Sequence, residues 1–169
     1  QYYDSVLIAD PHSSVTTALI DRCIVIEQED FVHNINLSRY HTVLVSPDLG
    51  ASKKTQAVAK ACNFERVVQA TKERNLKTGE ITATKIDCED IGDHTFLIVD
   101  DICDGGRTFI ELAKELRKRT QGKIYLYVTH GIFSKGARPL MQYIDHIYTA
   151  YPFADGVDDA YITVVQPKG

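Results

Sequence analysis

Short apolar runs alternate with segments of helical periodicity along most of the chain. The apolar runs are continuous rather than alternating, which is typical of strands that are buried on both faces of a parallel sheet. Strands are predicted at 6–9, 23–26, 42–45, 67–68, 96–99, 124–128, 146–149 and 161–165. Helices are predicted at about 13–21, 51–62, 107–119 and 135–143. This order predicts an α/β fold, a mostly parallel twisted sheet with helices on both faces.

One polar region, 71–93, interrupts this pattern because it offers few side chains to bury. We expect part of it to form an exposed hairpin or a mobile loop, with a flexible loop at about 72–80.

Polar residues, in one case with a glycine, follow four of the predicted strands where each strand ends. They are Asp10 and His12; Ser46, Asp48 and Gly50; Asp100, Asp101 and Asp104; and Thr129 and His130. In open α/β sheets, ligands bind at the carboxyl ends of the strands. We therefore expect these four strand ends to converge on one binding site.

The segment after the fifth strand has the most specific pattern. Asp100 and Asp101 end the apolar run, and Asp104 precedes Gly105-Gly106-Arg107-Thr108 at the start of a predicted helix. Adjacent carboxylates repel each other and glycine is a poor helix former, so the pattern indicates a ligand. The backbone N–H groups of 104–108 can cradle a phosphate, and carboxylates accept hydrogen bonds from sugar hydroxyls. A ribose 5-phosphate meets both demands; the alternative is an acidic turn with Asp104 as the helix N-cap.

Composition narrows the function classes. The chain has 169 residues, 44% hydrophobic and 25% charged, as expected of one globular domain. Its net charge of −4 and its lack of a basic patch argue against nucleic acid as a partner. No apolar stretch is long enough to span a bilayer and no signal peptide pattern is present, so we expect a cytoplasmic protein with no membrane partner.

Known cofactor and metal motifs are absent from the sequence. The four cysteines form no CxxC pair, which argues against a zinc site and a disulfide framework and fits a reducing compartment. No GxxxxGK[ST], GxGxxG, HExxH or GxSxG pattern occurs, so P-loop kinases and Rossmann dinucleotide enzymes have no support.

The stretch Asp100-Asp101-Ile-Cys-Asp104-Gly-Gly-Arg-Thr108 resembles the phosphoribosyl diphosphate (PRPP) loop of type I phosphoribosyltransferases and PRPP synthetases. The usual form reads Asp-Thr-Gly-Gly-Thr, so this chain has one threonine less and an added arginine. The resemblance implies a type I phosphoribosyltransferase-like fold. It also implies a sugar-phosphate site formed by Asp100, Asp101, Asp104, Gly105, Gly106, Arg107 and Thr108.

Other segments are similar to PRPP synthetases in particular. The segment Ser46-Pro-Asp-Leu-Gly-Ala-Ser-Lys-Lys54 resembles their pyrophosphate loop. This similarity implies that pyrophosphate and ATP are bound by Asp48, Leu49, Gly50, Ala51 and Lys53. Thr71-Lys72-Glu73-Arg74 resembles their Lys-x-Arg catalytic loop, which implies that Lys72 and Arg74 neutralise charge on the transferred group.

Two histidine-containing segments extend the resemblance. Asp10-Pro11-His12 matches the synthetase Asp-Leu-His, and this match implies that His12 binds Mg²⁺, together with Asp48. Thr129-His130-Gly131 matches the family's Thr-His, for which we expect a supporting or structural role. A lone histidine is more often structural, so the role of His12 depends on the resemblance.

The resemblance extends from about residue 3 to about residue 152 and fits the carboxy-terminal half of a PRPP synthetase. It implies a single phosphoribosyltransferase-like domain over residues 1–169 without the amino-terminal half, either an excised domain or a shortened relative. The implied reaction is attack of the 1-hydroxyl of ribose 5-phosphate on ATP, with Mg²⁺, giving PRPP and AMP. The full-length protein would be a homo-oligomer.

Alternative functions remain open at this point. A type I phosphoribosyltransferase would use the same sugar site with PRPP and a nucleobase. A non-catalytic relative would act as a binding or regulatory subunit. A two-metal hydrolase, which would use the acids and His12, is excluded because it leaves the glycines and the Lys-x-Arg segment unexplained.

Overall fold

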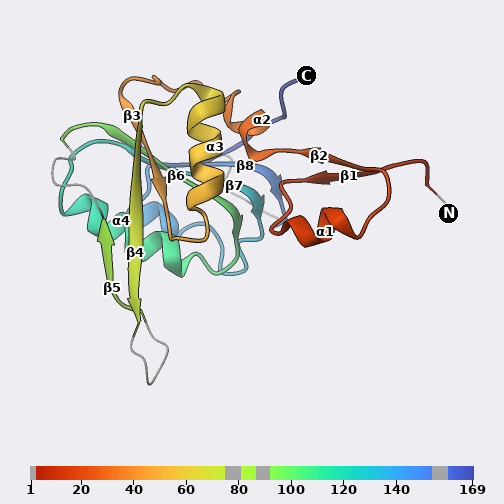
Figure 1. Cartoon of the computed structure of the whole chain (residues 1–169). Coiled ribbons are helices and arrows are strands. Elements are labelled where there is room, and N and C mark those ends of the chain that lie inside the picture. Colours follow the sequence, from red (N-terminus) through yellow and green to blue (C-terminus); the bar gives the residue numbers. More distant parts are fainter. Residues whose placement is uncertain (1–2, 75–80, 87–91, 154–159) are drawn as a thin grey trace.

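The structure, a computed structural model, describes residues 3–74, 81–86, 92–153 and 160–169, with the backbone alone for 72–74 and 81–83. Its body is a seven-stranded sheet in the order β5-β4-β3-β6-β7-β8-β9 (Figure 1). The strands are β3 (Thr42–Ser46), β4 (Arg66–Arg74), β5 (Ile81–Ile86), β6 (Thr95–Cys103), β7 (Ile124–Gly131), β8 (His146–Pro152) and β9 (Ile162–Val164). Among the described strands, only β4 and β5 pair antiparallel, so the predicted mostly parallel α/β sheet is confirmed.

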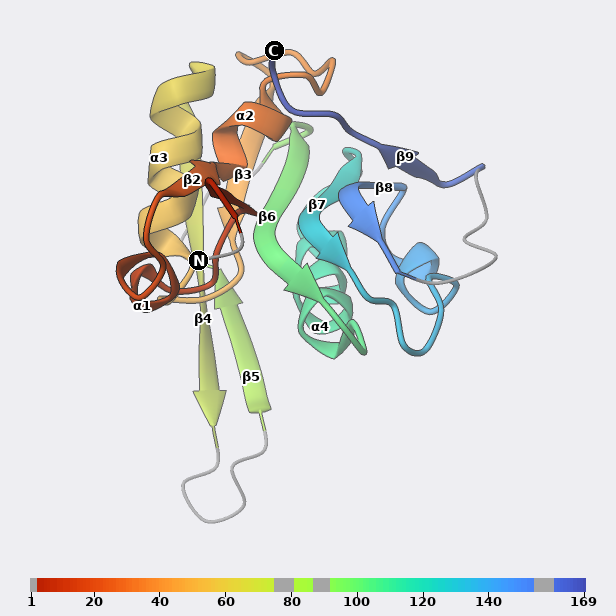
Figure 2. The same cartoon turned by 90° about the vertical axis from the view of Figure 1, so that its right-hand side faces the viewer.

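Helices cover both faces of this sheet (Figure 2). The helical elements are α1 (Ser14–Ala18), α2 (Gln28–Val32), α3 (Ser52–Cys62), α4 (Arg107–Arg117) and the 3₁₀ turn η1 (Leu140–Gln142). Helices α2 and α3 pack on one face and α4 packs on the other. No helix in the described part of the chain is long and apolar enough to cross a membrane.

Strand β6 shows why its apolar run is continuous. Phe96 and Ile98 pack in the core cluster that contains α4. Leu97 and Val99 pack in the cluster that contains residues of α2 and α3. All four side chains are fully buried. Because successive side chains of a strand point to opposite faces, a strand covered on both faces must be apolar at every position.

Strands β1 (Val6–Ala9) and β2 (Cys23–Ile26) form a separate two-stranded parallel sheet with α1 between them. This unit projects from the body in Figure 1. Several of its apolar side chains, among them Leu7, Val15 and Leu19, are exposed. The carboxyl end of β1 still reaches the main sheet, because Asp10 there contacts Thr129 at the end of β7.

Two local predictions differ from the structure. The helix predicted at 135–143 is wrong, since this segment forms turns and only the short η1. Gly136 there has a left-handed φ of 71° and Pro139 lacks an amide hydrogen, and both interrupt a helix. Helix α2 was not predicted; it is short and begins with a capping box formed by Glu27 and Asp30.

The polar region 71–93 contains part of an antiparallel hairpin. Strands β4 and β5 pair with Thr71 opposite Lys85, so the hairpin, one of the two expected forms, is present. The backbone of 72–74 continues β4. The flexible loop predicted at about 72–80 otherwise falls on 75–80, which lie outside the described residues.

Candidate functional site

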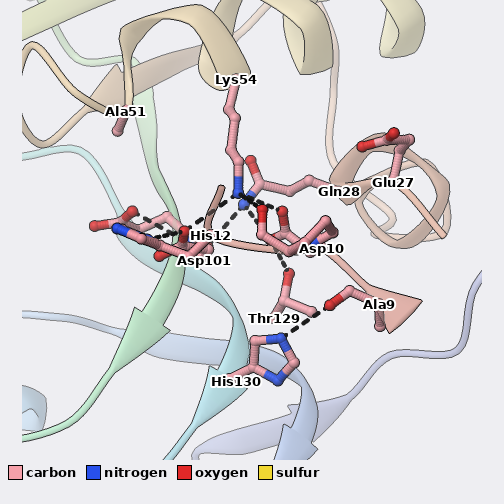
Figure 3. A network of polar contacts seen from close by, with 12 residues as sticks. Ala9, Asp10, His12, Glu27, Gln28, Ala51, Lys54, Asp101, Thr129 and His130 are labelled. Atoms are coloured by element: carbon pink, nitrogen blue, oxygen red, sulfur yellow. Dashed lines mark hydrogen bonds and ion pairs between the residues drawn. The ribbon is translucent and has the colours of Figure 1, made fainter. Parts of the chain in front are cut away.

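Asp10 is the buried centre of a polar network at the strand ends (Figure 3). Its side chain is 1% exposed and its backbone has a left-handed φ of 42°. Oδ2 accepts hydrogen bonds from Thr129 Oγ1 at 2.6 Å and from Gln28 Nε2 at 3.0 Å. Gln28 Nε2 also donates to the carbonyl oxygen of Asp100 at 2.8 Å. The ends of β1, β6 and β7 therefore meet, as the strand-end pattern predicts.

Lys54 joins helix α3 to the same network. Its Nζ donates to Asp10 Oδ1 at 2.8 Å, to the carbonyl oxygen of Pro11 at 2.9 Å and to Asp101 Oδ2 at 3.2 Å. Burial by itself lowers the pKa of Lys54, but the hydrogen bonds and negative charges of Asp10 and Asp101 outweigh it and raise the pKa. Lys54 is therefore a fixed cation that compensates two buried carboxylates.

His12 contacts one of these two carboxylates, that of Asp101. Its Nδ1 lies 2.7 Å from Asp101 Oδ2, and its side chain is 86% exposed. Asp101 Oδ2 also accepts from Lys54, and with this oxygen as the acceptor His12 Nδ1 is the donor in the contact. The Nε2 lone pair of His12 is then available to a metal ion or a ligand.

Adjacent positions on β6 send Asp100 and Asp101 to opposite sides of the sheet. Asp101 follows Leu97 and Val99 toward the α3 face, where it meets Lys54. Asp100 follows Phe96 and Ile98 toward the α4 face. The structure therefore does not bring the two acids into one pocket.

A pocket of about 370 Å³ lies on the α4 face, and we call it the α4 pocket. Its lining includes most of the predicted sugar-phosphate residues and one residue of the predicted pyrophosphate loop. The lining residues are Asp48, Asp100, Ile102, Asp104, Gly105, Gly106, Arg107, Thr108, Phe109 and Lys135. Segments from the end of β3, from β6 and from the loop after β7 thus form one site.

The turn that opens α4 leaves its amides available. Gly106 is the N-cap, with a left-handed φ of 72° that favours glycine. The first bond of the helix runs from the amide of Ile110 to the carbonyl of Gly106 at 3.0 Å. Among the described residues, the amides of 104–108 donate to no other protein group. The alternative in which Asp104 caps the helix is therefore wrong.

Buried Cys103, beside this turn, is not a reactive thiol. Burial, followed by the nearby charges of Asp100 and Asp104, raises its pKa to about 12. It therefore stays protonated at neutral pH, and nucleophilic cysteine chemistry does not belong to this site.

The residues of the predicted pyrophosphate loop do not all face the α4 pocket. Asp48 faces the α4 pocket, and its Oδ1 accepts a hydrogen bond from the amide of Ala51 at 3.1 Å. Leu49 and Gly50 are exposed at the turn before α3, and Lys53 is exposed on that helix. Of this loop, the structure brings only Asp48 into the α4 pocket.

The remaining predictions concern the catalytic residues Lys72 and Arg74 and the metal site. The side chains of Lys72 and Arg74 lie outside the described part of the structure. Within the described residues, no three acidic, histidine or cysteine side chains cluster in a way that could hold a metal ion. The carboxylate of Asp48 nevertheless fits Mg²⁺, which prefers oxygen ligands and takes few of them from the protein when it binds phosphates.

A second pocket of about 790 Å³ adjoins the first, and we call it the β1 pocket. It is mostly apolar and shares Ile102 with the α4 pocket. Its lining comprises Leu7, Ile8, Ala9, Asp10, Pro11, His12, Thr16, Asp101, Ile102, His130, Tyr151 and Phe153. His130 stacks on Tyr151 with ring centroids 5.7 Å apart, and its Nε2 lies 3.1 Å from the carbonyl oxygen of Ala9. His130 thus holds β1 against the aromatic end of β8.

Gln28 and Lys135 had no predicted site role, and Lys54 was predicted only as added positive charge in the pyrophosphate loop. Gln28 and Lys54 contact Asp10, and Lys135 lines the α4 pocket. For Lys54 a signal was present, because the spacing of Val58, Ala59 and Cys62 puts position 54 on the inner face of α3. Gln28 and Lys135 lie in a short helix and a loop without such periodicity.

Comparisons with known proteins agree with this architecture. The family model described as phosphoribosyl transferase domain matches residues 19–156. The chain is 26% identical over 142 residues to the ribose-phosphate pyrophosphokinase of Pyrococcus furiosus, covering 80% of this chain and 48% of that protein. It is 35% identical over 95 residues to the one from Thermococcus kodakarensis, covering 56% of this chain and 33% of that protein.

A solved structure shares the fold. The crystal structure of phosphoribosylpyrophosphate synthetase from Mycobacterium smegmatis matches with a TM-score of 0.80 at 17% identity, over 96% of this chain and 54% of that chain. The chain thus spans about half the length, or less, of each of these three proteins.

Proposed function

Because the chain belongs to the phosphoribosyl transferase domain family, we propose that it carries the sugar-phosphate site of a ribose-phosphate diphosphokinase. The reaction would transfer diphosphate from ATP to the 1-hydroxyl of ribose 5-phosphate and release AMP. One observation carries the proposal: the α4 pocket combines an open turn of backbone amides with carboxylates at one strand end. The similarity to ribose-phosphate pyrophosphokinases favours this reaction over others that use the same fold.

The proposed binding mode divides the substrate between two kinds of group. The 5-phosphate would lie against the amides of 104–108, where Thr108 and Arg107 add donors. The ribose hydroxyls would donate to Asp100, which lines the same pocket. Asp101 would act indirectly, since it contacts Lys54 and His12 instead.

Phosphoryl transfer of this kind depends mainly on positioning and on neutralising charge. Mg²⁺, held by Asp48 in the α4 pocket or by His12 in the adjoining β1 pocket, would supply positive charge to the phosphates of ATP. Asp101 would keep the Nε2 atom of His12 directed outward through its contact with Nδ1. Lys72 and Arg74, which belong to β4, would supply further positive charge at the transferred group.

One observation supports a second candidate function. The β1 pocket presents Tyr151 and Phe153 next to the sugar-binding strand end, with Ile102 common to both pockets. Aromatic side chains beside a ribose site can stack on a nucleobase. A type I phosphoribosyltransferase, in which a base replaces the diphosphate of PRPP, is therefore the alternative.

The two functions make different products. The protein is incubated with ATP, Mg²⁺ and ribose 5-phosphate, and nucleotides are separated by anion-exchange chromatography. The proposal expects AMP that appears only when ribose 5-phosphate is present, and less of it with Asp100→Asn. A parallel incubation with PRPP and nucleobases tests the alternative, which expects diphosphate release that depends on the base. Base-dependent release without AMP formation would overturn the proposal.

A further inference from the structure

Lys135 lies in the loop between β7 and η1 and lines the α4 pocket. The side chains of Lys135 and Arg107 are the only cationic groups among the described residues that line this pocket. Neither forms a hydrogen bond or an ion pair with another described side chain. Asp48, Asp100 and Asp104 line the same pocket, so an anion that enters it meets negative charge as well.

The stem of Lys135 passes directly over Gly105. A Cβ atom added at Gly105 would lie 3.7 Å from Lys135 Cε and 3.8 Å from Cδ, which is ordinary van der Waals contact. The lysine stem therefore passes close to the amide turn at position 105.

We propose that Lys135, whose stem passes over the amide turn at Gly105, is a binding residue for the phosphate group of the substrate. This inference rests on the proposed function and deepens it by adding a residue from a separate loop. The usual PRPP loop has a threonine after its first aspartate, where this chain has Gly105. In this chain the lysine ammonium supplies the donor that a threonine hydroxyl would supply there.

The charges in the α4 pocket determine how Lys135 should affect phosphate binding. A dianionic phosphate on the turn would be flanked by Arg107 from the turn itself and Lys135 from the opposite loop. Together these cations offset part of the repulsion from the three carboxylates of the pocket. Removing the ammonium while keeping the apolar stem should therefore weaken binding of the phosphorylated sugar and leave binding of ribose itself unchanged.

The test is isothermal titration calorimetry with ribose 5-phosphate and with ribose. Lys135→Met keeps the stem and removes the charge. We expect its dissociation constant for ribose 5-phosphate to rise about tenfold, as for the loss of one charge-assisted hydrogen bond. Lys60→Met is the matched control, since Lys60 is exposed at the last turn of α3 and carries the same charge. It should change the constant less than about twofold.

A double-mutant cycle tests the link to Gly105. Gly105→Thr supplies a hydroxyl donor at the position where the usual PRPP loop has one, so adding Lys135→Met should then weaken binding by less than about threefold. Equal binding by wild type and Lys135→Met would overturn the role of Lys135 and leave the proposed function standing. A wild-type protein that does not bind ribose 5-phosphate would overturn both.

Discussion

Lys54 Nζ donates to Asp10 Oδ1 at 2.8 Å and thereby ties helix α3 to the end of strand β1. The same ammonium reaches Asp101 at the end of β6. In the described part of the chain, strands β1 and β2 pair only with each other, so these side-chain contacts are a principal link between that small sheet and the main one. Lys54 thus helps to fix the Asp10-Pro11-His12 segment relative to the rest of the site, together with Thr129 and Gln28, which also contact Asp10.

Lys54→Met should destabilise the fold. It leaves two buried carboxylates without their cation, and breaking a buried pair in this way is strongly unfavourable. Since Lys54 is one-third exposed, we expect a loss of about 2–3 kcal/mol in the free energy of unfolding, toward the lower end of such effects. Urea denaturation measures it. Lys53→Met, one residue away and exposed, should change stability by less than about 0.5 kcal/mol. Equal effects of the two variants would contradict the role of Lys54.

Asp100→Asn and Asp101→Asn should act on different properties, although the residues are adjacent. Asp100 lines the α4 pocket, so its substitution should raise the dissociation constant for ribose 5-phosphate about tenfold. Asp101 contacts Lys54 and His12, so its substitution should lower stability by about 1–3 kcal/mol and change ribose 5-phosphate affinity less than about threefold. Calorimetry and urea denaturation on both variants separate the effects. A similar loss of sugar-phosphate affinity in both would mean that the acids share one ligand.

The ionisation of Asp145 should make the free energy of unfolding depend on pH in the acid range. Burial by itself raises the pKa of Asp145, but hydrogen bonds from the Ile124 amide, Arg117 and Lys123 outweigh it, and the net pKa is lowered. A lowered folded-state pKa means that the stabilisation is fully present above the ordinary value of 3.8 and is lost as the pH falls below it. In Asp145→Asn this part of the acid dependence should disappear.

The measurement for Asp145 is the free energy of unfolding in urea at about pH 6, 4 and 3, which brackets the ordinary carboxyl pKa. Wild type should lose more stability than Asp145→Asn over the lower part of this range. Glu111→Gln removes an exposed carboxylate paired with Lys114 and serves as the control. Parallel pH curves for wild type and Asp145→Asn would show that this carboxylate does not carry the effect.

Gly106→Ala should lower the free energy of unfolding more than Gly136→Ala does. The two glycines have nearly equal φ values of 72° and 71°, so the backbone strain is matched at about 1–2 kcal/mol. A Cβ at Gly106 would lie 3.1 Å from Leu140 Cδ2, whereas one at Gly136 would meet nothing within 4 Å. The extra cost at Gly106, about 1 kcal/mol or more in urea denaturation, measures how tightly the amide turn packs on η1. Equal costs would indicate that Leu140 moves aside freely.

Much of the fold follows from the apolar runs, because a strand covered on both faces has no polar positions. The run Phe96–Val99 identified β6 for this reason. The separation of Asp100 from Asp101 also follows from the two-residue period of a strand, but the sequence-based prediction assigned the two acids to one ligand. The turn at 104–108 was predictable because its parts are adjacent in the chain.

The remaining features depend on distant contacts. Gln28 reaches the carbonyl oxygen of Asp100, 72 residues away, and Lys135 lies over Gly105 from another loop. No local pattern encodes such pairs, since each depends on how the connections after the strands cross the sheet edge. The wrong prediction of a helix at 135–143 has a local cause instead. Gly136 and Pro139 interrupt a helix there, although the spacing of the apolar residues favours one.

The central claim is that the turn of amides at the start of α4 holds the phosphate of ribose 5-phosphate. An amide ¹H–¹⁵N NMR titration with this sugar phosphate tests it most directly, with ribose as the reference. We predict that the largest shifts fall on the amides of Gly105, Gly106, Arg107 and Thr108 and that ribose does not reproduce them. Shifts centred instead on the β1 pocket, around His12 and His130, or no shifts at 104–108, would contradict the claim.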